Sequence, residues 1–170
     1  MLTLTAVQTN MEIIIENDLK ALIDSCEYVV DQKMLDYFDS KWNDGNCGYT
    51  SRLNVECECL EYAMLASGHT VLDMPLRGER YVWRNDGIFH NLKVDFKEWA
   101  MTTPNISFNL NKLNESTTLG CLTHLVIWSR NIRGPLKLGD RLKFKCHSIV
   151  DMKTVNTKAI NRGNYHLLKV

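Results

Sequence analysis

The sequence lacks several features that define large classes of proteins. No apolar run approaches the roughly 20 residues that cross a bilayer, so we predict no transmembrane segment. The opening stretch MLTLTAVQTNMEIII has no basic residue, so we predict no signal peptide. The sequence also has no G-x-S-x-G elbow, no P-loop and no G-x-G-x-x-G turn. Serine hydrolases of that type, P-loop enzymes and dinucleotide-binding enzymes are therefore not supported.

Histidine and cysteine are present, but not in metal-binding patterns. The five histidines form no H-x-x-x-H or H-E-x-x-H pair, so a zinc hydrolase is not predicted. His124 lies in a strongly apolar run and is interpreted as a core histidine. The six cysteines form no C-x-x-C pair, and Cys57-x-Cys59 is too sparse for a zinc site. We predict reduced, mostly buried thiols in a cytoplasmic protein.

The net charge is zero, but the charges are unevenly distributed along the chain. Residues 1–45 carry nine acidic and three basic residues, a net charge of −6. Residues 101–170 carry eleven basic and three acidic residues, a net charge of +8. A local excess of positive charge attracts polyanions even when the whole chain is neutral. An ordinary solvated surface with an uneven charge distribution is the alternative.

Apolar residues at helical spacing predict the first half of the chain to be largely helical. We expect two helices in the acidic segment 1–45, the first running from Met11 to Tyr28. We interpret this segment as a helical extension of a core that spans residues 46–170. Another helix is expected over residues 50–67, with Thr50 or Ser51 as its N-cap and Gly68 just past its end.

Strand-like segments follow this helix. We expect strands over residues 69–75, 80–89 and 91–97, with a turn at His90-Asn91. Residues 98–120 are mixed, and one interpretation places a helix over 112–119. The run Leu122–Trp128 is almost continuously apolar, which is typical of a central strand covered on both faces. The order is therefore helix, three strands, a mixed segment and a buried strand.

Two acids and a lysine lie in the stretch WRNDGIFHNLKVDFKEW. Strand alternation would point Asp95 and Lys97 to one face and Phe96 to the other. Asp86 precedes them on the preceding strand. Carboxylates on adjacent strands beside an ammonium suit a divalent cation that meets a phosphate. The pattern Asp86…Asp95-x-Lys97 resembles the signature of the PD-(D/E)XK nucleases, which include many restriction enzymes, homing endonucleases and junction resolvases.

The resemblance covers roughly residues 50–130 and implies both a fold and a site. The implied fold is a restriction-endonuclease-like αβββαβ core with a mixed sheet, to which we add the helical extension and a basic C-terminal hairpin. The implied activity is Mg²⁺-dependent cleavage of DNA, with Mn²⁺ as a substitute. Asp86, Asp95 and the Phe96 carbonyl would hold the metal, and Lys97 would act on the attacking water. A helix glutamate completes such sites, and Glu58 fits best among three candidates, the others being Glu56 and Glu61.

Three alternatives remain open from the sequence. Asp86-Gly87 could form a hairpin turn, which would carry Asp86 away from Asp95. The chain could be an inactive DNA- or partner-binding module of the same fold. It could also be a resolvase-like nuclease that acts on branched DNA.

Basic residues near the C-terminus are the candidate DNA contacts. Arg141, Lys143 and Lys145 alternate with apolar residues, so they would share the outer face of one strand. Arg84 is a further candidate on the first hairpin. A small nuclease with one site usually needs a symmetric dimer to cut both strands of a duplex, so we expect a homo-oligomer.

Overall fold

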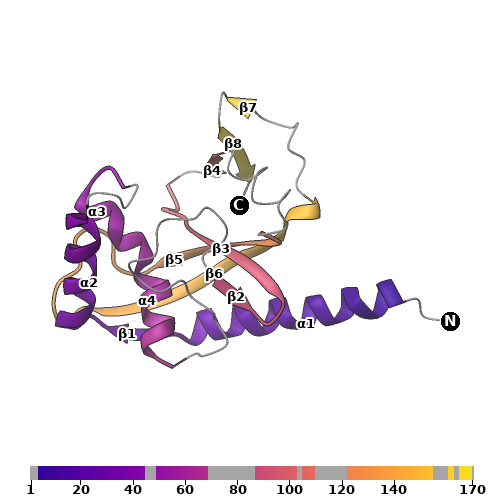
Figure 1. Ribbon diagram of the computed structural model, residues 1–170, viewed down its shortest axis with the longest axis horizontal. Helices are drawn as coiled ribbons and strands as arrows, with labels where there is room; N and C mark the ends of the chain where they lie inside the picture. Colours follow the sequence, from indigo (N-terminus) through magenta and orange to yellow (C-terminus); the bar gives the residue numbers. More distant parts are fainter. Residues whose placement is uncertain are drawn as a thin grey trace.

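The computed structural model describes residues 4–44, 49–68, 87–102, 105–109, 122–154, 161–162 and 165–169. These residues form a mixed α/β structure with helices on one side of a five-stranded sheet and a second, three-stranded sheet beyond it (Figure 1). The helices are α1 Leu4–Ser25, α2 Gln32–Asn43, α3 Arg52–Val55, η1 Glu56–Glu58, α4 Cys59–Ala66 and η2 Met152–Thr154. The strands are β1 Glu27–Val29, β2 Gly87–Phe89, β3 Leu92–Glu98, β4 Asn105–Asn109, β5 His124–Arg130, β6 Arg141–Asp151, β7 Asn161–Arg162 and β8 Tyr165–Lys169. No described helix is both long enough and apolar enough to span a bilayer.

The main sheet has the strand order β1-β6-β5-β3-β2. β3 and β5 are parallel, and every other neighbouring pair is antiparallel. The mixed sheet and the helix-before-strands order agree with the expected α/β class. The expected first strand (69–75), most of the second (80–89) and the expected helix over 112–119 lie outside the described residues.

The β2–β3 hairpin turns where the sequence predicted. Gly87 pairs with Val94 and Phe89 with Leu92, so His90 and Asn91 form the turn, with His90 at φ 53°. This pairing contradicts the alternative in which Asp86-Gly87 is the hairpin tip, because Gly87 is a strand residue.

Predicted helix ends are confirmed in the region around α3 and α4. The Ser51 side chain accepts a hydrogen bond from the backbone N–H of Asn54, as an N-cap does. Gly68 has φ +75°, the left-handed conformation that glycine adopts most easily after a helix. The predicted single helix is, however, divided into α3, a 3₁₀ turn (η1) and α4.

One prediction about the ends of the chain needs correction and one is confirmed. The first helix ends at Ser25, not Tyr28, because Glu27–Val29 form β1 and pair with Arg141–Lys143 of β6. The acidic segment thus supplies an edge strand of the main sheet. The basic strand β6 lies between β1 and β5 inside the main sheet. The expected C-terminal hairpin beyond it is confirmed, because β7 and β8 form an antiparallel pair in which Tyr165–Lys169 is the second arm.

The core lies between the helices and one face of the main sheet. Val94 and Phe96 of β3 and Trp128 of β5 are buried there against α1, α2 and α4. A smaller cluster on the other face contains Ile106, Leu122, Leu125, Ile127 and Met152. β5 is buried on both faces, which confirms the prediction of a central strand. Four described cysteines are free thiols, and three of them are buried.

Candidate active site

Asp95 and Lys97 lie on the same face of β3, as strand alternation predicted. Their side chains approach to 3.6 Å (Lys97 Nζ to Asp95 Oδ2) and are partly exposed. The residues that alternate with them along β3 are buried in the helical core, namely Leu92, Val94 and Phe96. The β2–β3 ladder ends at Val94, one residue before Asp95. Asp95 and Lys97 are thus held on a rigid strand and turned away from the main core.

Glu58, the predicted helix ligand, is held in a hydrogen-bond network. Its Oε1 accepts from the Tyr37 hydroxyl at 2.8 Å and from Lys41 Nζ at 2.7 Å. Its Oε2 accepts from the Tyr49 hydroxyl at 2.5 Å. The Glu58 side chain is only 8% exposed. Both oxygens are therefore engaged, and the network joins α2 to η1.

Removing Glu58 should destabilise the protein. In a Glu58→Ala protein, Lys41 and two tyrosine hydroxyls lose their acceptor in a largely buried place. We expect a loss of roughly 3–4 kcal/mol, the lower part of the range for broken buried pairs, because Lys41 is partly exposed. Urea unfolding measures this loss, with the exposed Glu27→Ala as the control. A loss as small as that of the control would mean that the network contributes nothing.

The pKa of the helix carboxylate Glu61 depends on the charges of Asp95 and Lys97. It lies one turn after Glu58 and is half-buried. Burial raises the pKa of Glu61 well above its usual range, and the negative charges of Glu58 and Asp95 raise it further. The positive charges of Lys41 and Lys97 lower that pKa. Glu61, Asp95 and Lys97 therefore form one electrostatically connected group. In the sequence analysis Glu61 is one of three candidate helix ligands, and Glu58 fits better.

The raised pKa of Glu61 predicts an unusual stability profile. A carboxyl whose pKa rises on folding binds its proton more tightly in the native protein, so its contribution to stability is lost as the pH rises from near 4.5 through the native pKa. Glu61→Gln removes that loss. The variant should be more stable than the wild type at about pH 8, with the difference shrinking toward pH 4.5. Melting temperatures across this range test it, with Glu27→Gln as the control, and a variant less stable at high pH would contradict it.

A pocket of about 430 Å³ lies at the carboxyl ends of β3 and β5. Arg130 lines it and forms an ion pair with Glu98 at 2.9 Å. Tyr49 and Cys57 connect the pocket to Glu58, because both line it and Tyr49 also binds Glu58. The pocket is lined by Tyr49, Leu53, Asn54, Cys57, Glu98, Trp99, Ala100, Arg130, Arg133 and Gly134. Burial raises the pKa of the Cys57 thiol to about 12, which disfavours a thiolate nucleophile here.

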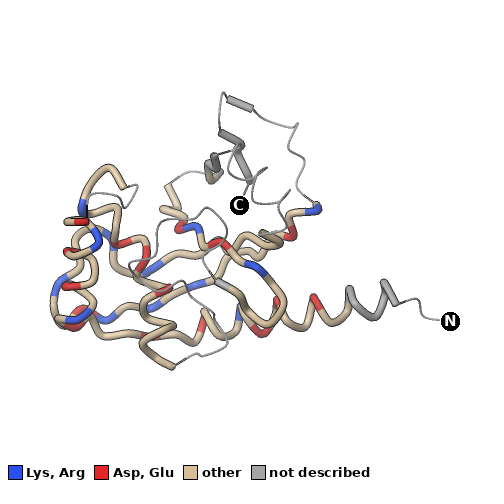
Figure 2. Tube along the Cα trace, viewed as in Figure 1, with Lys and Arg blue, Asp and Glu red and all other residues tan. Residues whose placement is uncertain are grey.

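The basic residues of β6 share a sheet face with Asp95 and Lys97. Residues paired across a sheet point to the same side. Asp95 pairs with Leu125, Lys97 with Ile127, and Ser129 (two residues further along β5) with Lys145. Arg141, Lys143 and Lys145 are exposed while Leu142, Phe144 and Cys146 are buried, so the predicted alternation is confirmed. Figure 2 shows these basic positions recurring along β6.

Two predicted site residues, Asp86 and Arg84, lie outside the described residues, so their placement stays a prediction. The role of the Phe96 carbonyl as a metal ligand also stays a prediction. The buried Phe96 side chain is confirmed as a core residue.

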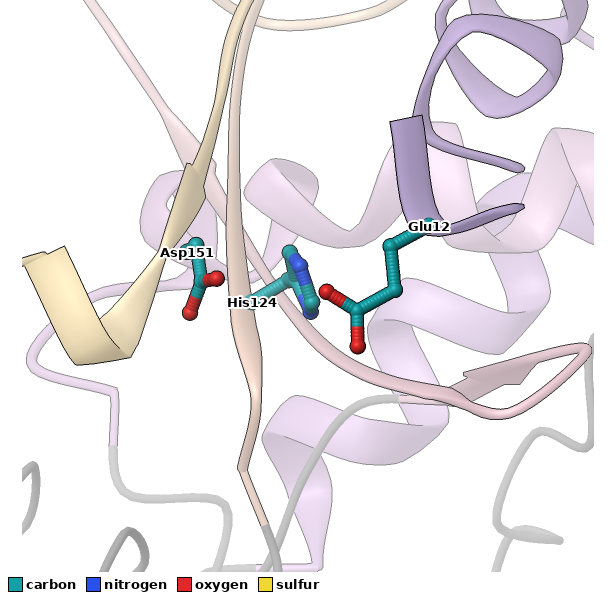
Figure 3. A group of neighbouring side chains, drawn as sticks. All are labelled: Glu12, His124 and Asp151. Carbon is teal, nitrogen blue, oxygen red and sulfur yellow. The ribbon is translucent and has the colours of Figure 1, made fainter. Parts of the chain in front are cut away.

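A second group of acids and a histidine lies elsewhere on the main sheet. Glu12 of α1, His124 of β5 and Asp151 of β6 each offer a ligand atom, and these atoms lie within 4.8 Å of one another (Figure 3). This group could hold a metal ion. The sequence analysis missed it, because Glu12, His124 and Asp151 are far apart in the chain and form no local metal-binding motif.

Comparison with protein-family models, with curated proteins and with solved structures found no match for this chain. The observed class is therefore a mixed α/β protein with a five-stranded mixed sheet, described by its own geometry.

Proposed function

We propose that this protein is a metal-dependent DNA endonuclease of the PD-(D/E)XK type. The observation that carries the proposal is the electrostatic group of Glu61, Asp95 and Lys97. Carboxylates on a helix and a strand, beside a lysine two residues further along that strand, are the parts needed to hold Mg²⁺ next to a phosphodiester. The parallel pairing of β3 with β5 and the helix-before-strands order also support it.

Each residue has a distinct role in this proposal. Asp95 and Glu61 supply carboxylate oxygens, the ligands that Mg²⁺ prefers. Burial is the main cause of the raised pKa of Glu61, but the negative charges of Glu58 and Asp95 add to it, and a bound cation would offset that repulsion. Lys97 positions the attacking water and offsets charge on the phosphate. Glu58 positions the helix through Tyr37, Lys41 and Tyr49, and Asp86 remains a proposed additional ligand. The metal, when bound, would activate water and stabilise charge on the phosphate.

DNA would contact the exposed residues of one face of the main sheet, namely Asp95, Lys97 and the basic residues of β6, beside the part of the face that the Ile106 cluster covers. The pocket at the strand ends has Arg130 and Arg133 among its lining residues, and its strand residues Glu98 and Arg130 lie on the helix-facing side of the sheet, since they pair with Trp128 and Phe144. The positive charges of Arg141, Lys143 and Lys145 would follow the phosphates, since alternate strand residues stand roughly 7 Å apart. Cutting both strands of a duplex would require a symmetric homodimer or a higher oligomer.

Replacing the three basic residues of β6 should weaken DNA binding for all sequences alike. The triple variant Arg141→Gln, Lys143→Gln, Lys145→Gln removes up to three phosphate contacts, each contributing a salt slope near −0.9 on duplex DNA. Log K against log salt should therefore flatten by about two to three units. The control removes the same charge elsewhere, with Lys33, Lys137 and Lys153 all changed to Gln. Equal salt slopes in the two variants would place the DNA surface elsewhere.

The experiment that tests the function compares plasmid and branched DNA on one gel. The protein is incubated with Mg²⁺, with Mn²⁺ and with EDTA. Cleavage only with the metals would support the proposal, and preference for the branched substrate would indicate a resolvase-like enzyme. DNA binding with no cleavage under any condition would instead indicate an inactive binding module. Both oxygens of Glu58 already accept hydrogen bonds, which removes one expected metal ligand. This observation favours the inactive binding module as the second candidate.

A further inference from the structure

We propose that Glu12, His124 and Asp151 form a transition-metal site that fastens α1 to the ends of β5 and β6. Ligand atoms bound about 2.1 Å from one ion lie at most about 4.2 Å apart. The three side chains already place their ligand atoms within 4.8 Å of one another, so a small inward movement suffices. Figure 3 shows the three side chains converging from α1, β5 and β6.

The fold holds these residues in place from three directions. His124 and Asp151 are direct partners in the antiparallel β5–β6 ladder, so their side chains share a face. One oxygen of Asp151 accepts from the backbone N–H of Lys153 at 2.9 Å, which fixes the carboxylate. Glu12 lies one helical turn before Glu16, whose Oε1 is 2.9 Å from His124 Nε2. His124 is only 3% exposed, so the imidazole has a fixed environment.

The second ring nitrogen of His124 is positioned by a neighbouring hydroxyl. His124 Nδ1 lies 2.8 Å from Thr123 Oγ1. That hydroxyl accepts from the backbone N–H of Lys93 at 2.9 Å and can donate to the Lys93 carbonyl at 3.2 Å. In this arrangement the hydroxyl is left to accept a proton from Nδ1–H. Release of the proton between His124 Nε2 and Glu16 Oε1 would then free the Nε2 lone pair for a metal ion, as in a histidine that binds a metal.

Charge balance also points to a cation. Three carboxylates, those of Glu12, Glu16 and Asp151, gather around one imidazole. Between residues that the structure describes, no ion pair joins any of these carboxylates to a lysine or arginine. The positive charge of a protonated His124 offsets the charge of one carboxylate, and the remaining carboxylates still repel each other. A divalent cation offsets all of them.

The ligand set selects the class of ion. Imidazole nitrogen with carboxylate oxygen suits Zn²⁺, Mn²⁺, Fe²⁺ or Co²⁺, whereas Mg²⁺ prefers ligands that are all oxygen. Glu16 or a water would complete four-coordination around Zn²⁺. The site is separate from the proposed hydrolytic group. His124 pairs with Val94, so it shares the face opposite to that of Asp95 and Lys97.

Zn²⁺ binding to the full chain after EDTA treatment and buffer exchange tests the proposal. Calorimetry should show one equivalent of Zn²⁺ bound, and the melting temperature should rise with Zn²⁺ concentration. Glu12→Gln and Asp151→Asn should each weaken binding at least about tenfold, because each removes a ligand charge. Co²⁺ should give visible absorption bands that both variants weaken.

Two controls separate this site from its alternatives. Asp18→Asn removes an exposed acid from the same helix, and Asp36→Asn removes an exposed acid from α2; both should bind Zn²⁺ as the wild type does. Circular dichroism should show the wild-type spectrum for Glu12→Gln, so that weaker Zn²⁺ binding can be assigned to the lost ligand and not to unfolding. Zn²⁺ affinity unchanged in Glu12→Gln would overturn the proposal and indicate binding elsewhere, for example at the cysteines. Absence of binding to the wild type at about 0.1 mM Zn²⁺ would also overturn it, since structural zinc sites bind far more tightly.

Discussion

An Asp95→Asn protein is expected to lose DNA cleavage by at least about a hundredfold, the scale of removing one electrostatic contact to a transition state. Asparagine keeps the shape of the side chain but removes the negative charge that would hold Mg²⁺. Binding of DNA should stay the same or become tighter, because the change also removes a charge that repels phosphate. Plasmid cleavage and DNA affinity, measured on the same preparation, test both statements.

The matched control for this experiment is Asp18→Asn, which removes an exposed acid far along α1. It should cut at the wild-type rate, so any general effect of lost charge is visible in it. An Asp95→Asn protein that cuts as fast as the control would show that this group is not the active site. Loss of DNA binding together with cleavage would instead indicate that Asp95 has a structural role.

Phe96→Ala and Lys97→Ala are expected to separate stability from activity in neighbouring residues. Phe96 is 6% exposed and packs in the helical core, so its truncation should cost about 3–5 kcal/mol. The Lys97 side chain is 41% exposed, and its ion pair with Asp95 contributes little to stability at such exposure. Lys97→Ala should therefore melt near the wild-type temperature while losing cleavage.

Thermal melting and the plasmid assay together check this pair. Phe96→Leu, which keeps most of the buried volume, serves as the control for the core substitution and should lose much less stability than Phe96→Ala. Equal thermal losses in Phe96→Ala and Lys97→Ala would mean that Lys97 is structural. Wild-type cleavage by a stable Lys97→Ala protein would remove the lysine from the mechanism.

Local sequence signals were sufficient wherever the structure depends on neighbouring residues. The two-residue period of β3 places Asp95 and Lys97 on one face and Phe96 on the other, because a strand alternates its side chains. The same period gives the exposed and buried faces of β6. Ser51 and Gly68 mark helix ends, because each satisfies a conformational or hydrogen-bonding need of its own segment.

Pairings between distant segments were decided only by the tertiary structure. Nothing in the sequence joins Glu27–Val29 to Arg141–Lys143, so β1 was missed. Strand pairing is a contact between segments far apart in the chain, and a three-residue segment such as β1 is too short to carry a period that reveals its partner.

The choice among acids was decided in the same way. Spacing along the helix favoured Glu58, but Tyr37, Lys41 and Tyr49 engage both of its oxygens, and the charges of Asp95 and Lys97 act on Glu61. His124 looked like a core histidine until α1 and β6 brought Glu12 and Asp151 beside it. By itself the sequence determined which side chains share a strand face and that Ser51 and Gly68 mark helix ends. Only the folded chain decided which charges meet, because electrostatic contacts depend on distance in space and not on position in the sequence.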